Sequence, residues 1–532
     1  MFRNKYQTRL IFLISVFATL ALFIFEELFF NEPNTRFMAF AREKGATAYL
    51  IWLFTLISGL FLNIHWFWWS LRAKTAYRIL YGVIFALGVF IQYGYWNVLH
   101  RLIQPTDIAL LGITSTQAWV DSYKLYFSWY GLFIGIPYLI ILYIFRGYKY
   151  SGWKEFSFSL IAIFILTVLT SHSGITFSAG TSFSESLHSL SVYLVDGINP
   201  VSRDTLSYHS QTVPKQNIVL IIDEGIRGDH LSINGYSRET TPWLDELKKQ
   251  EKVYSWGIIS SGATCSQLSN QLLITGIIPS QNNIKDVAHA PTIFQYARSA
   301  GYKSYYLDAQ TNYFWNGLSP VDTEWIEWIN ISSLGITPDA DINAANIIKE
   351  TVGTSTGNFI VLNKRGVHFM YEDSYPQAAT IWTPLPPGQN YIEFPDLVPN
   401  PYDNGVKYSV DGFFRELLTD VKSYRNTLYI YTSDHAQTLF ENGMTWSHCN
   451  SSTIEASVPL LIFGDLSKAP DTSYKASHSN IFPTILDLMD IPKSEYKYKY
   501  NFSLLDHENQ NMDRYFINGA SNLILFSDAN SQ

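Results

Sequence analysis

Cysteine is scarce in this 532-residue chain, which contains only Cys265 and Cys449. Two cysteines cannot build a disulfide framework, and neither stands in a Cys-x-x-Cys or zinc-finger spacing. A single bridge between them stays possible. Basic charge is also low, because 37 Lys and Arg stand against 45 Asp and Glu, for a formal net charge of −8. This balance argues against nucleic acid as a partner, since nucleic-acid-binding surfaces are basic.

Charged residues are rare in five long apolar runs, all of which precede His172. The runs are Leu10–Phe30, Ala48–Leu71, Ile79–Leu99, Leu125–Phe145 and Phe156–Leu169. A membrane-spanning helix needs about 20 mostly apolar residues, which the second to fourth runs provide. The first run contains Glu26 and Glu27, which we expect at a membrane interface, and the fifth run needs its flanks. The sequence therefore predicts a transmembrane domain of five helices over residues 1–172.

Lys and Arg in the short loops predict the orientation of this domain. The N-terminal segment and the second and fourth loops together carry nine basic residues, whereas the opposite loops carry five. Because basic loops stay in the cytoplasm, the N-terminus is expected there. With an odd number of spans, everything after His172 lies on the outer side of the membrane.

The rest of the chain has the pattern of a soluble domain. Residues 173–214 are Ser-rich and predict a connector with short interfacial helices, whereas residues 215–532 alternate short apolar runs with helical stretches. This alternation is typical of an α/β domain with a mostly parallel central sheet. Polar residues follow the apolar runs at Asp223-Glu224, Asp308, Gly366-Val367-His368, Asp434-His435 and Gly464-Asp465. Ligands bind beyond the carboxyl ends of parallel strands, so the functional site is expected there.

Three of these residues form a candidate metal site. Glu224 follows one predicted strand, and Asp434 and His435 follow another. Two carboxylates and an imidazole suit zinc, and also manganese. Three protein ligands would leave a fourth position open for a nucleophile or water, as catalytic zinc sites require.

Two segments of the chain resemble known family motifs. DEGIRGDHLSINGYSRETTPWL resembles a signature of the membrane-anchored phosphoethanolamine transferases, a branch of the alkaline-phosphatase/sulfatase superfamily. YTSDHAQTLFENG resembles that branch's Ser-Asp-His segment. Weaker matches are RGVHFMYEDSYP, YDNGVKYSVD and SHSNIFPTILDL. The residues on the two main motifs are Glu224, Arg227, Asp229, His230, Ser232, Gly235, Tyr236, Ser433, Asp434, His435, Leu439, Glu441, Asn442 and Gly443. The resemblance covers Asn217 to about Ile491.

The chain departs from this family pattern at several positions. Asp223 replaces a Gly, Gly225 replaces a Thr or Ser, and Ala436-Gln437 replaces Gly-Glu. The cysteine pairs that brace the site in many members are expected to be missing. The Cys-x-Pro-x-Arg signature of true sulfatases is also missing, because Cys265 is followed by Ser-Gln-Leu-Ser.

The resemblance implies a role for each candidate residue. Glu224, Asp434 and His435 would bind Zn²⁺, with Mn²⁺ as an alternative. Such a cation lowers the pKa of a coordinated hydroxyl, which then attacks a phosphodiester and forms a covalent phospho-enzyme. His368 and His448 match histidines that hold the donor phosphate or protonate a leaving group. His230, next to Asp229, is expected to be structural.

The segment SGATCSQLSN contains three candidates for the nucleophile. The family nucleophile lies nine residues before the Ser or Thr that closes the next helix, and counting back from Thr275 selects Ser266. Counting forward from Gly262 selects Cys265, and the Thr that is usual in this branch selects Thr264. A phosphorothiolate lies outside the family's chemistry, which disfavours Cys265. Ser266 and Thr264 both remain candidates. Any of the three would lie at a helix N-terminus, where backbone N–H groups favour a phosphate.

The expected function is transfer of phosphoethanolamine from phosphatidylethanolamine to an envelope acceptor such as lipid A, the lipopolysaccharide core or a glycan. The resemblance implies a monomer in a bacterial inner membrane, with the catalytic domain in the periplasm. One alternative is a phosphoglycerol transferase. Others are a hydrolase of the phosphodiesterase or sulfatase type, and an inactive protein that binds lipid or a partner.

Overall fold

The computed structural model describes most of the chain, in two compact units, Met1–Pro200 and Val201–Gln532. The described residues are 2–30, 38–99, 102–103, 108, 127–144, 181–196, 202–210, 213–280, 284–310, 317–331, 338–419, 426–441, 444, 448–506, 513–519 and 522–527.

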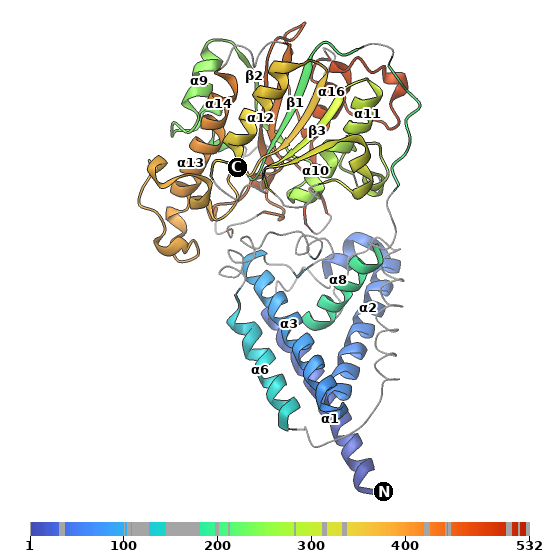
Figure 1. Ribbon diagram of the computed structural model, residues 1–532. Helices are drawn as coiled ribbons and strands as arrows, with labels where there is room; N and C mark the ends of the chain where they lie inside the picture. The colour runs from blue at the N-terminus through green and yellow to red at the C-terminus, as the bar shows by residue number, and fades with distance from the viewer. Residues whose placement is uncertain are drawn as a thin grey trace. The chain divides into compact units, whose positions relative to one another are not determined.

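Long helices make up the described part of the first unit (Figure 1). They are α1 (Phe2–Phe29), α2 (Met38–Arg72), α3 (Thr75–Leu99), α6 (Trp129–Ile144) and α8 (Ser182–Asp196). Arg9–Glu26 and Thr75–Asn97 are long and apolar enough to cross a membrane, and α6 is a shorter apolar helix. The fifth predicted run, Phe156–Leu169, lies outside the described residues. The count of five spans therefore stays a prediction.

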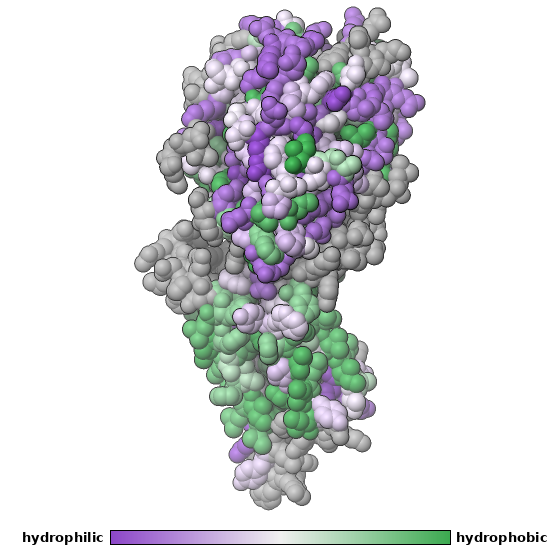
Figure 2. All heavy atoms as spheres, turned by 90° about the vertical axis from the view of Figure 1, so that its left-hand side faces the viewer, coloured by the Kyte–Doolittle hydropathy of each residue, from purple (hydrophilic) through white to green (hydrophobic). Residues whose placement is uncertain are grey.

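Aromatic residues fill the interior of this helical unit, and apolar residues also cover its outside. Tyr81, Phe85 and Tyr93 are buried, whereas Phe17 and Phe133 are 75% and 73% exposed. Figure 2 shows the corresponding hydrophobic surface in green. A bundle that is apolar on both its inner and outer faces is typical of helices surrounded by lipid.

Glycines on α6 allow it to pack closely on α3. A Cβ atom at Gly131 would lie 2.8 Å from the Cα atom of Phe90, and one at Gly135 would lie 3.3 Å from the Cβ atom of Ala86. Small residues at such positions are typical of helix pairs in membranes.

Glu26 in the first apolar run is buried in the structure. Its carboxylate accepts hydrogen bonds from the Ser182 backbone N–H at 2.8 Å and from the Tyr93 hydroxyl at 3.4 Å. Ser182 is the first residue of α8, so this carboxylate pairs with one backbone N–H at the start of that helix. The membrane-interface position of Glu26 stays a prediction.

A seven-stranded sheet forms the centre of the second unit. Its strand order is β2-β7-β6-β1-β5-β3-β4. The strands are β1 (Asn217–Asp223), β2 (Val253–Ser260), β3 (Lys303–Asp308), β4 (Glu327–Asn330), β5 (Asn358–Asn363), β6 (Thr427–Ser433) and β7 (Ser457–Phe463). A second sheet pairs β8 (Tyr515–Ile517) with β9 (Leu523–Leu525). The main sheet is mixed, because β7 is antiparallel to both β6 and β2 while the other neighbouring pairs are parallel.

The direction of β7 corrects one prediction. The sequence predicts that Gly464-Asp465, which follows this strand, lies with the polar residues that follow β1, β3, β5 and β6. Because β7 is antiparallel to β6, its C-terminal end lies beside the N-terminal ends of the parallel strands. The start of β7, at Ser457, lies instead near the C-terminal ends of the parallel strands.

Helices pack on both faces of this sheet (Figure 1). The helices α10 (Ser266–Thr275), α11 (Ile293–Ser299) and α16 (Ile481–Leu488) share one apolar core with alternate residues of β1. Phe414 of α14 (Phe413–Leu418) contacts Tyr431 and Phe463 with ring centroids 4.9 and 4.8 Å away. The unit also contains α9 (Pro242–Lys249), α12 (Ala340–Thr354) and α13 (Pro399–Val406).

Candidate metal centre

The ends of two neighbouring strands bring the predicted metal ligands together. Strands β1 and β6 are parallel, with Asp223 opposite Ser433. The next residues are Glu224 on one strand and Asp434 on the other, and the Asp434 N–H donates to the Asp223 carbonyl at 2.8 Å. Every residue of both strands is buried, and the candidate ligands directly follow the two strands. The sheet therefore fixes the spacing of this site.

Glu224, Asp434 and His435 form a compact buried cluster. One candidate ligand atom from each residue lies within 4.8 Å of the others. His435 Nε2 lies 3.2 Å from a Glu224 carboxylate oxygen and 3.6 Å from Asp434 Oδ2. His435 Nδ1 lies 2.8 Å from the Ala436 carbonyl, a contact that directs Nε2 toward the two carboxylates.

One buried atom in this cluster indicates that the donor set fits a cation. Within the part of the chain that the structure describes, Asp434 Oδ2 has no hydrogen-bond partner. A buried carboxylate oxygen without a partner is costly, and a metal ion would satisfy it. Two carboxylates and an imidazole are also the donor types that divalent transition metals prefer. The cluster can therefore hold a metal ion.

The three residues shift one another's pKa values, because two carboxylates and an imidazole are buried together. Burial and the nearby Glu224 raise the pKa of Asp434 well above its usual range. Burial alone would lower the pKa of His435, but the Asp434 and Glu224 carboxylates outweigh it and raise that pKa to about 10. The pKa of Glu224 is lowered, because the charge and hydrogen bond of His435 outweigh burial.

Ser266 lies directly on this cluster. Its Oγ atom is 2.9 Å from His435 Nε2 and 3.3 and 3.4 Å from the two carboxylate oxygens of Glu224. Ser266 is the first residue of α10, and Cys265 before it is extended at φ −117°. The start of the helix therefore points this hydroxyl toward the candidate ligands.

The side chains of Thr264 and Cys265 contact other residues instead of the candidate metal ligands. Thr264 is fully buried, and its hydroxyl donates to the Asn450 carbonyl at 2.9 Å. Cys265 forms a disulfide with Cys449, which is 184 residues away in sequence. The sequence left a single bridge between the two cysteines open, and the structure forms it. Of the three candidates, the geometry favours Ser266, although the nucleophile remains a prediction.

The predicted histidines have different surroundings. The His448 ring stacks on the His435 ring, with centroids 4.2 Å apart, and precedes the bridged Cys449. His368 Nδ1 lies 2.6 Å from the Phe369 carbonyl. Burial lowers the pKa of His368, whereas the Glu224 carboxylate opposes this shift. The chemical roles of these two histidines stay predictions.

His230 contacts a carboxylate in a separate polar cluster. Its Nδ1 atom lies 2.7 Å from Asp403, which also accepts hydrogen bonds from Tyr236 at 3.0 Å and Arg238 at 2.7 Å. This cluster joins the first motif to α13, which agrees with the structural role expected for His230.

Gln310 is a site residue that the sequence did not reveal. Its side-chain amide donates to Glu224 at 2.6 Å, and its carbonyl accepts from Asn363 at 3.3 Å. The available signal was its position two residues beyond the predicted strand that ends at Asp308. An uncharged amide in the short sequence Asp-Ala-Gln carries no recognisable motif, so the sequence alone does not predict its role.

A buried ion pair accounts for the unusual Asp223. The Lys364 ammonium pairs with the Asp223 carboxylate, donates to the Ser409 carbonyl at 2.7 Å and lies 3.7 Å from Asp341. Asp223 also accepts hydrogen bonds from Tyr431 at 2.9 Å and from the Glu224 backbone at 3.0 Å. This network supports the backbone at Glu224.

We expect Lys364→Met to destabilise the protein by about 3–5 kcal/mol, because it leaves two buried carboxylates without their cation. Urea unfolding of the full chain in detergent, followed by tryptophan fluorescence, measures this loss. Lys349→Met is the matched control, since Lys349 pairs with Glu416 at a partly exposed position and should cost less than about 1 kcal/mol. Equal losses for the two variants would contradict the proposed role of Lys364.

The comparison with protein-family models is decisive for classification. Residues 216–491, more than half of the chain, match the model described as Sulfatase. The chain belongs to the sulfatase family. The predicted sulfatase-like α/β domain is thus confirmed, and the strand ends that hold Glu224, Asp434 and His435 lie inside the sulfatase-family region.

Known proteins similar to this sulfatase-family chain include phosphoethanolamine transferases. Kdo(2)-lipid A phosphoethanolamine 7''-transferase of Escherichia coli (strain K12) is 23% identical over 314 residues, which are 54% of each chain. The present chain thus spans about half the length of this curated relative.

Two solved structures share the fold. The integral membrane lipooligosaccharide phosphoethanolamine transferase A from Neisseria meningitidis superposes with a TM-score of 0.60 at 17% identity, over 91% of this chain and 95% of that one. The periplasmic domain of EptC from Escherichia coli, in complex with Zn, gives a TM-score of 0.51 at 19% identity, over 61% of this chain and 97% of that domain. At these identities the likeness establishes the fold alone.

Proposed function

We propose that this chain transfers phosphoethanolamine from phosphatidylethanolamine to an envelope glycolipid or glycan, through a covalent intermediate on Ser266. The observation that carries the proposal is the Ser266 hydroxyl at 2.9 Å from His435 and 3.3 Å from Glu224, inside a cluster suited to a cation. The names of the relatives supply the group that is transferred.

Zinc is the proposed metal, with manganese as the alternative, and Glu224, Asp434 and His435 would hold it. When bound, it would supply positive charge that lowers the pKa of a nearby hydroxyl and stabilises phosphoryl oxygens. The Gln310 amide donates a hydrogen bond to one Glu224 oxygen, and the Ala436 carbonyl contacts His435 Nδ1. These contacts orient both residues as ligands.

In the first step, Ser266 Oγ forms a bond to the donor phosphorus, and the bond from phosphorus to the diacylglycerol oxygen breaks. The proton of Ser266 passes to water, and the departing diacylglycerol oxygen takes a proton from His368 or His448. The position of Ser266 at the first turn of α10 also directs backbone N–H groups at the phosphate.

In the second step, a hydroxyl of the acceptor attacks the same phosphorus and gives its proton to the histidine that lost one. The bond between Ser266 Oγ and phosphorus breaks, and Ser266 takes a proton back from water. Diacylglycerol and the phosphoethanolamine-modified acceptor are the products.

The proposed setting is a bacterial inner membrane. Residues 1–172 would form five spans with a cytoplasmic N-terminus, residues 173–214 the connector, and residues 215–532 a periplasmic catalytic domain. We also propose that the protein acts as a monomer. The apolar outer surface of α1, α3 and α6 supports an embedded unit.

A transfer assay tests the function. The purified chain is incubated in detergent with zinc, lipid A and phosphatidylethanolamine labelled in its ethanolamine. We expect label on lipid A only when zinc and the chain are both present. Phosphatidylglycerol labelled in its head group is tested as the matched donor. Transfer from phosphatidylglycerol but not from phosphatidylethanolamine would indicate a phosphoglycerol transferase. Release of free labelled head group without labelled lipid A would indicate a hydrolase.

A further inference from the structure

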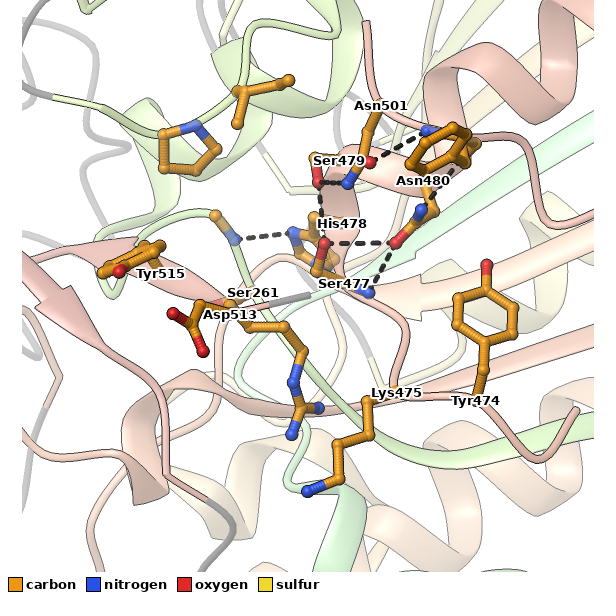
Figure 3. Close-up of a pocket in the computed structure, with 15 residues that line it drawn as sticks. Ser261, Tyr474, Lys475, Ser477, His478, Ser479, Asn480, Asn501, Asp513 and Tyr515 are labelled. Atoms are coloured by element: carbon orange, nitrogen blue, oxygen red, sulfur yellow. Dashed lines mark hydrogen bonds between the residues drawn. The ribbon is translucent and has the colours of Figure 1, made fainter. Parts of the chain in front are cut away.

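His478 is a buried histidine that the proposed chemistry does not use. It belongs to the motif SHSNIFPTILDL and is the first residue of the short 3₁₀ helix η14 (His478–Asn480), directly before α16. The residue is only 2% exposed. It lies in the wall of a pocket that also borders Ser261 and Gly262, in the segment that leads to Ser266 (Figure 3).

Polar neighbours hold the turn that carries His478. The Ser477 N–H donates to the Asn480 side-chain carbonyl at 2.9 Å, which closes the turn at its start. The Ser477 and Ser479 hydroxyls lie 2.7 Å apart, and the Asn501 amide donates to Ser479 at 2.7 Å. Figure 3 shows these side chains and their hydrogen bonds around His478. The position of the imidazole is therefore set by a well-bonded turn.

The ring of His478 contacts the chain on both sides of Ser266. Its Nδ1 atom accepts a hydrogen bond at 3.2 Å from the backbone N–H of Gly262, which precedes Ser266. The same atom lies 3.4 Å from the hydroxyl of Ser269, which follows Ser266 in α10. Ser269 in turn donates to the backbone carbonyl of Asp434, one of the candidate ligands. The histidine thus contacts both ends of the turn that presents the Ser266 hydroxyl.

The other ring nitrogen of His478 contacts strand β6. Nε2 lies 3.1 Å from the hydroxyl of Thr432, which lies in β6 just before Asp434. Thr432 donates its own hydrogen to the Ser433 carbonyl at 3.3 Å, so its oxygen can accept from Nε2–H. The Gly262 N–H can only donate, so Nδ1 must accept. These contacts select a neutral imidazole with its hydrogen on Nε2.

Burial keeps this imidazole neutral. Burial lowers the pKa of His478 to about 3, a shift that a hydrogen bond to the Ser433 backbone opposes and the nearby His435 reinforces. A neutral ring accepts at one nitrogen and donates at the other, whereas a protonated ring would lose the contact with the Gly262 N–H. The bridge from Gly262 to Thr432 is therefore intact at neutral pH.

The pocket beside the Ser266 segment makes this bridge more important. Ser261, Gly262 and His478 line about 620 Å³ of space outside the protein atoms, including the open mouth of the pocket. A segment that borders such a space lacks packed neighbours there. Hydrogen bonds must therefore contribute more to its position than in a fully packed core.

We propose that His478 is a positioning residue for Ser266. As a neutral bridge between Gly262 and Thr432, it holds the segment that carries the Ser266 hydroxyl against the strand that leads to the candidate ligands. It would act on the reaction through Ser266 alone. Its effect on the reaction rests on the function proposed above, whereas the bridge itself does not depend on that function.

Two conservative variants separate the two ends of the bridge. His478→Asn keeps an acceptor near the position of Nδ1, which can still meet the Gly262 N–H. His478→Gln keeps a donor near the position of Nε2, which can still meet Thr432 but leaves Gly262 without its acceptor. Because Gly262 belongs to the segment that carries Ser266, we expect His478→Gln to be the more damaging change.

The measurement is the single-turnover rate of Ser266 labelling by saturating phosphatidylethanolamine, with zinc and the full chain in detergent. His478→Gln should slow labelling about 30- to 100-fold, since a displacement of about 1 Å can cost about 10²-fold. His478→Asn should slow it about 3- to 10-fold, the effect of one neutral hydrogen bond. Bound zinc and the KM for the donor should stay within about 2-fold of the wild type in both variants.

Size alone predicts the opposite order, because Gln is closer to His in volume than Asn is. Faster labelling in His478→Gln than in His478→Asn, or equal labelling in His478→Gln and the wild type, would overturn the proposal. Loss of zinc from His478→Gln would also overturn it, since the effect would then lie in the metal ligands.

Thr432→Val extends the test to a chain that keeps the imidazole, in case His478→Gln does not fold. It removes the hydroxyl that meets Nε2 and should slow labelling about 3- to 10-fold. Thr484→Val is the matched control, because the Thr484 hydroxyl is also buried but donates to the Asn480 carbonyl at 2.6 Å. It should change labelling less than about 2-fold. Equal slowing by the two variants would contradict the bridge.

Hydrogen exchange tests the bridge without the reaction. Peptides from residues 258–270 of the full chain should exchange at least about 10-fold faster at Gly262 in His478→Gln, and at the wild-type rate in Thr484→Val. This result in a chain that never labels Ser266 would support the bridge and contradict the transferase function. Unchanged exchange in His478→Gln would overturn the bridge, and labelling of wild-type Ser266 would then still support the transferase function.

Discussion

Glu224→Gln is expected to empty the metal site and abolish transfer. The amide keeps the size of the carboxylate but removes the charge that faces His435 at 3.2 Å. Loss of an outer contact to a metal ligand already costs about 10- to 100-fold in affinity, so loss of a ligand should cost at least about 100-fold. Metal analysis after dialysis measures the stoichiometry, and the lipid A assay measures the activity.

Glu327→Gln is the control for this experiment. Glu327 loses the same charge at an exposed ion pair with Lys303, and full metal content is expected. Unchanged metal content in Glu224→Gln would remove Glu224 from the ligand set. Metal loss in both variants would show that the effect is not specific to the site.

Ser266→Ala is expected to lower the transfer rate by at least about 10³-fold, because the atom that would form the covalent bond is removed. Thr264→Val should retain most activity, since the Thr264 hydroxyl donates to the Asn450 carbonyl rather than facing the metal ligands. Its cost should appear in stability, at about 1–3 kcal/mol for a lost buried hydrogen bond. Initial rates with labelled phosphatidylethanolamine distinguish the two variants, and the opposite pattern would identify Thr264 as the nucleophile.

The candidate metal ligands could be proposed from the sequence because of a simple geometric rule. Neighbouring parallel strands end at the same edge of a sheet, and Glu224 and Asp434 directly follow two such strands. Apolar runs show where strands lie but not which way they point. The sequence therefore misplaced Gly464-Asp465, which follows the antiparallel strand β7.

Contacts between distant segments could not be predicted in the same way. The Cys265–Cys449 bridge joins residues 184 positions apart, and the Lys364 pair with Asp223 joins β1 to the segment after β5. Three adjacent side chains, Thr264 to Ser266, point in different directions because of the local turn and this bridge. Counting along the sequence cannot supply those directions.

The most direct test of the account is the mass of the tryptic peptides from residues 253–280 after incubation with zinc and phosphatidylethanolamine, without acceptor. The account predicts a phosphoethanolamine adduct that fragmentation places on Ser266, and that disappears when lipid A is added. Two results would contradict the account. One is an active enzyme in which these peptides stay unmodified, and the other is an adduct on Thr264.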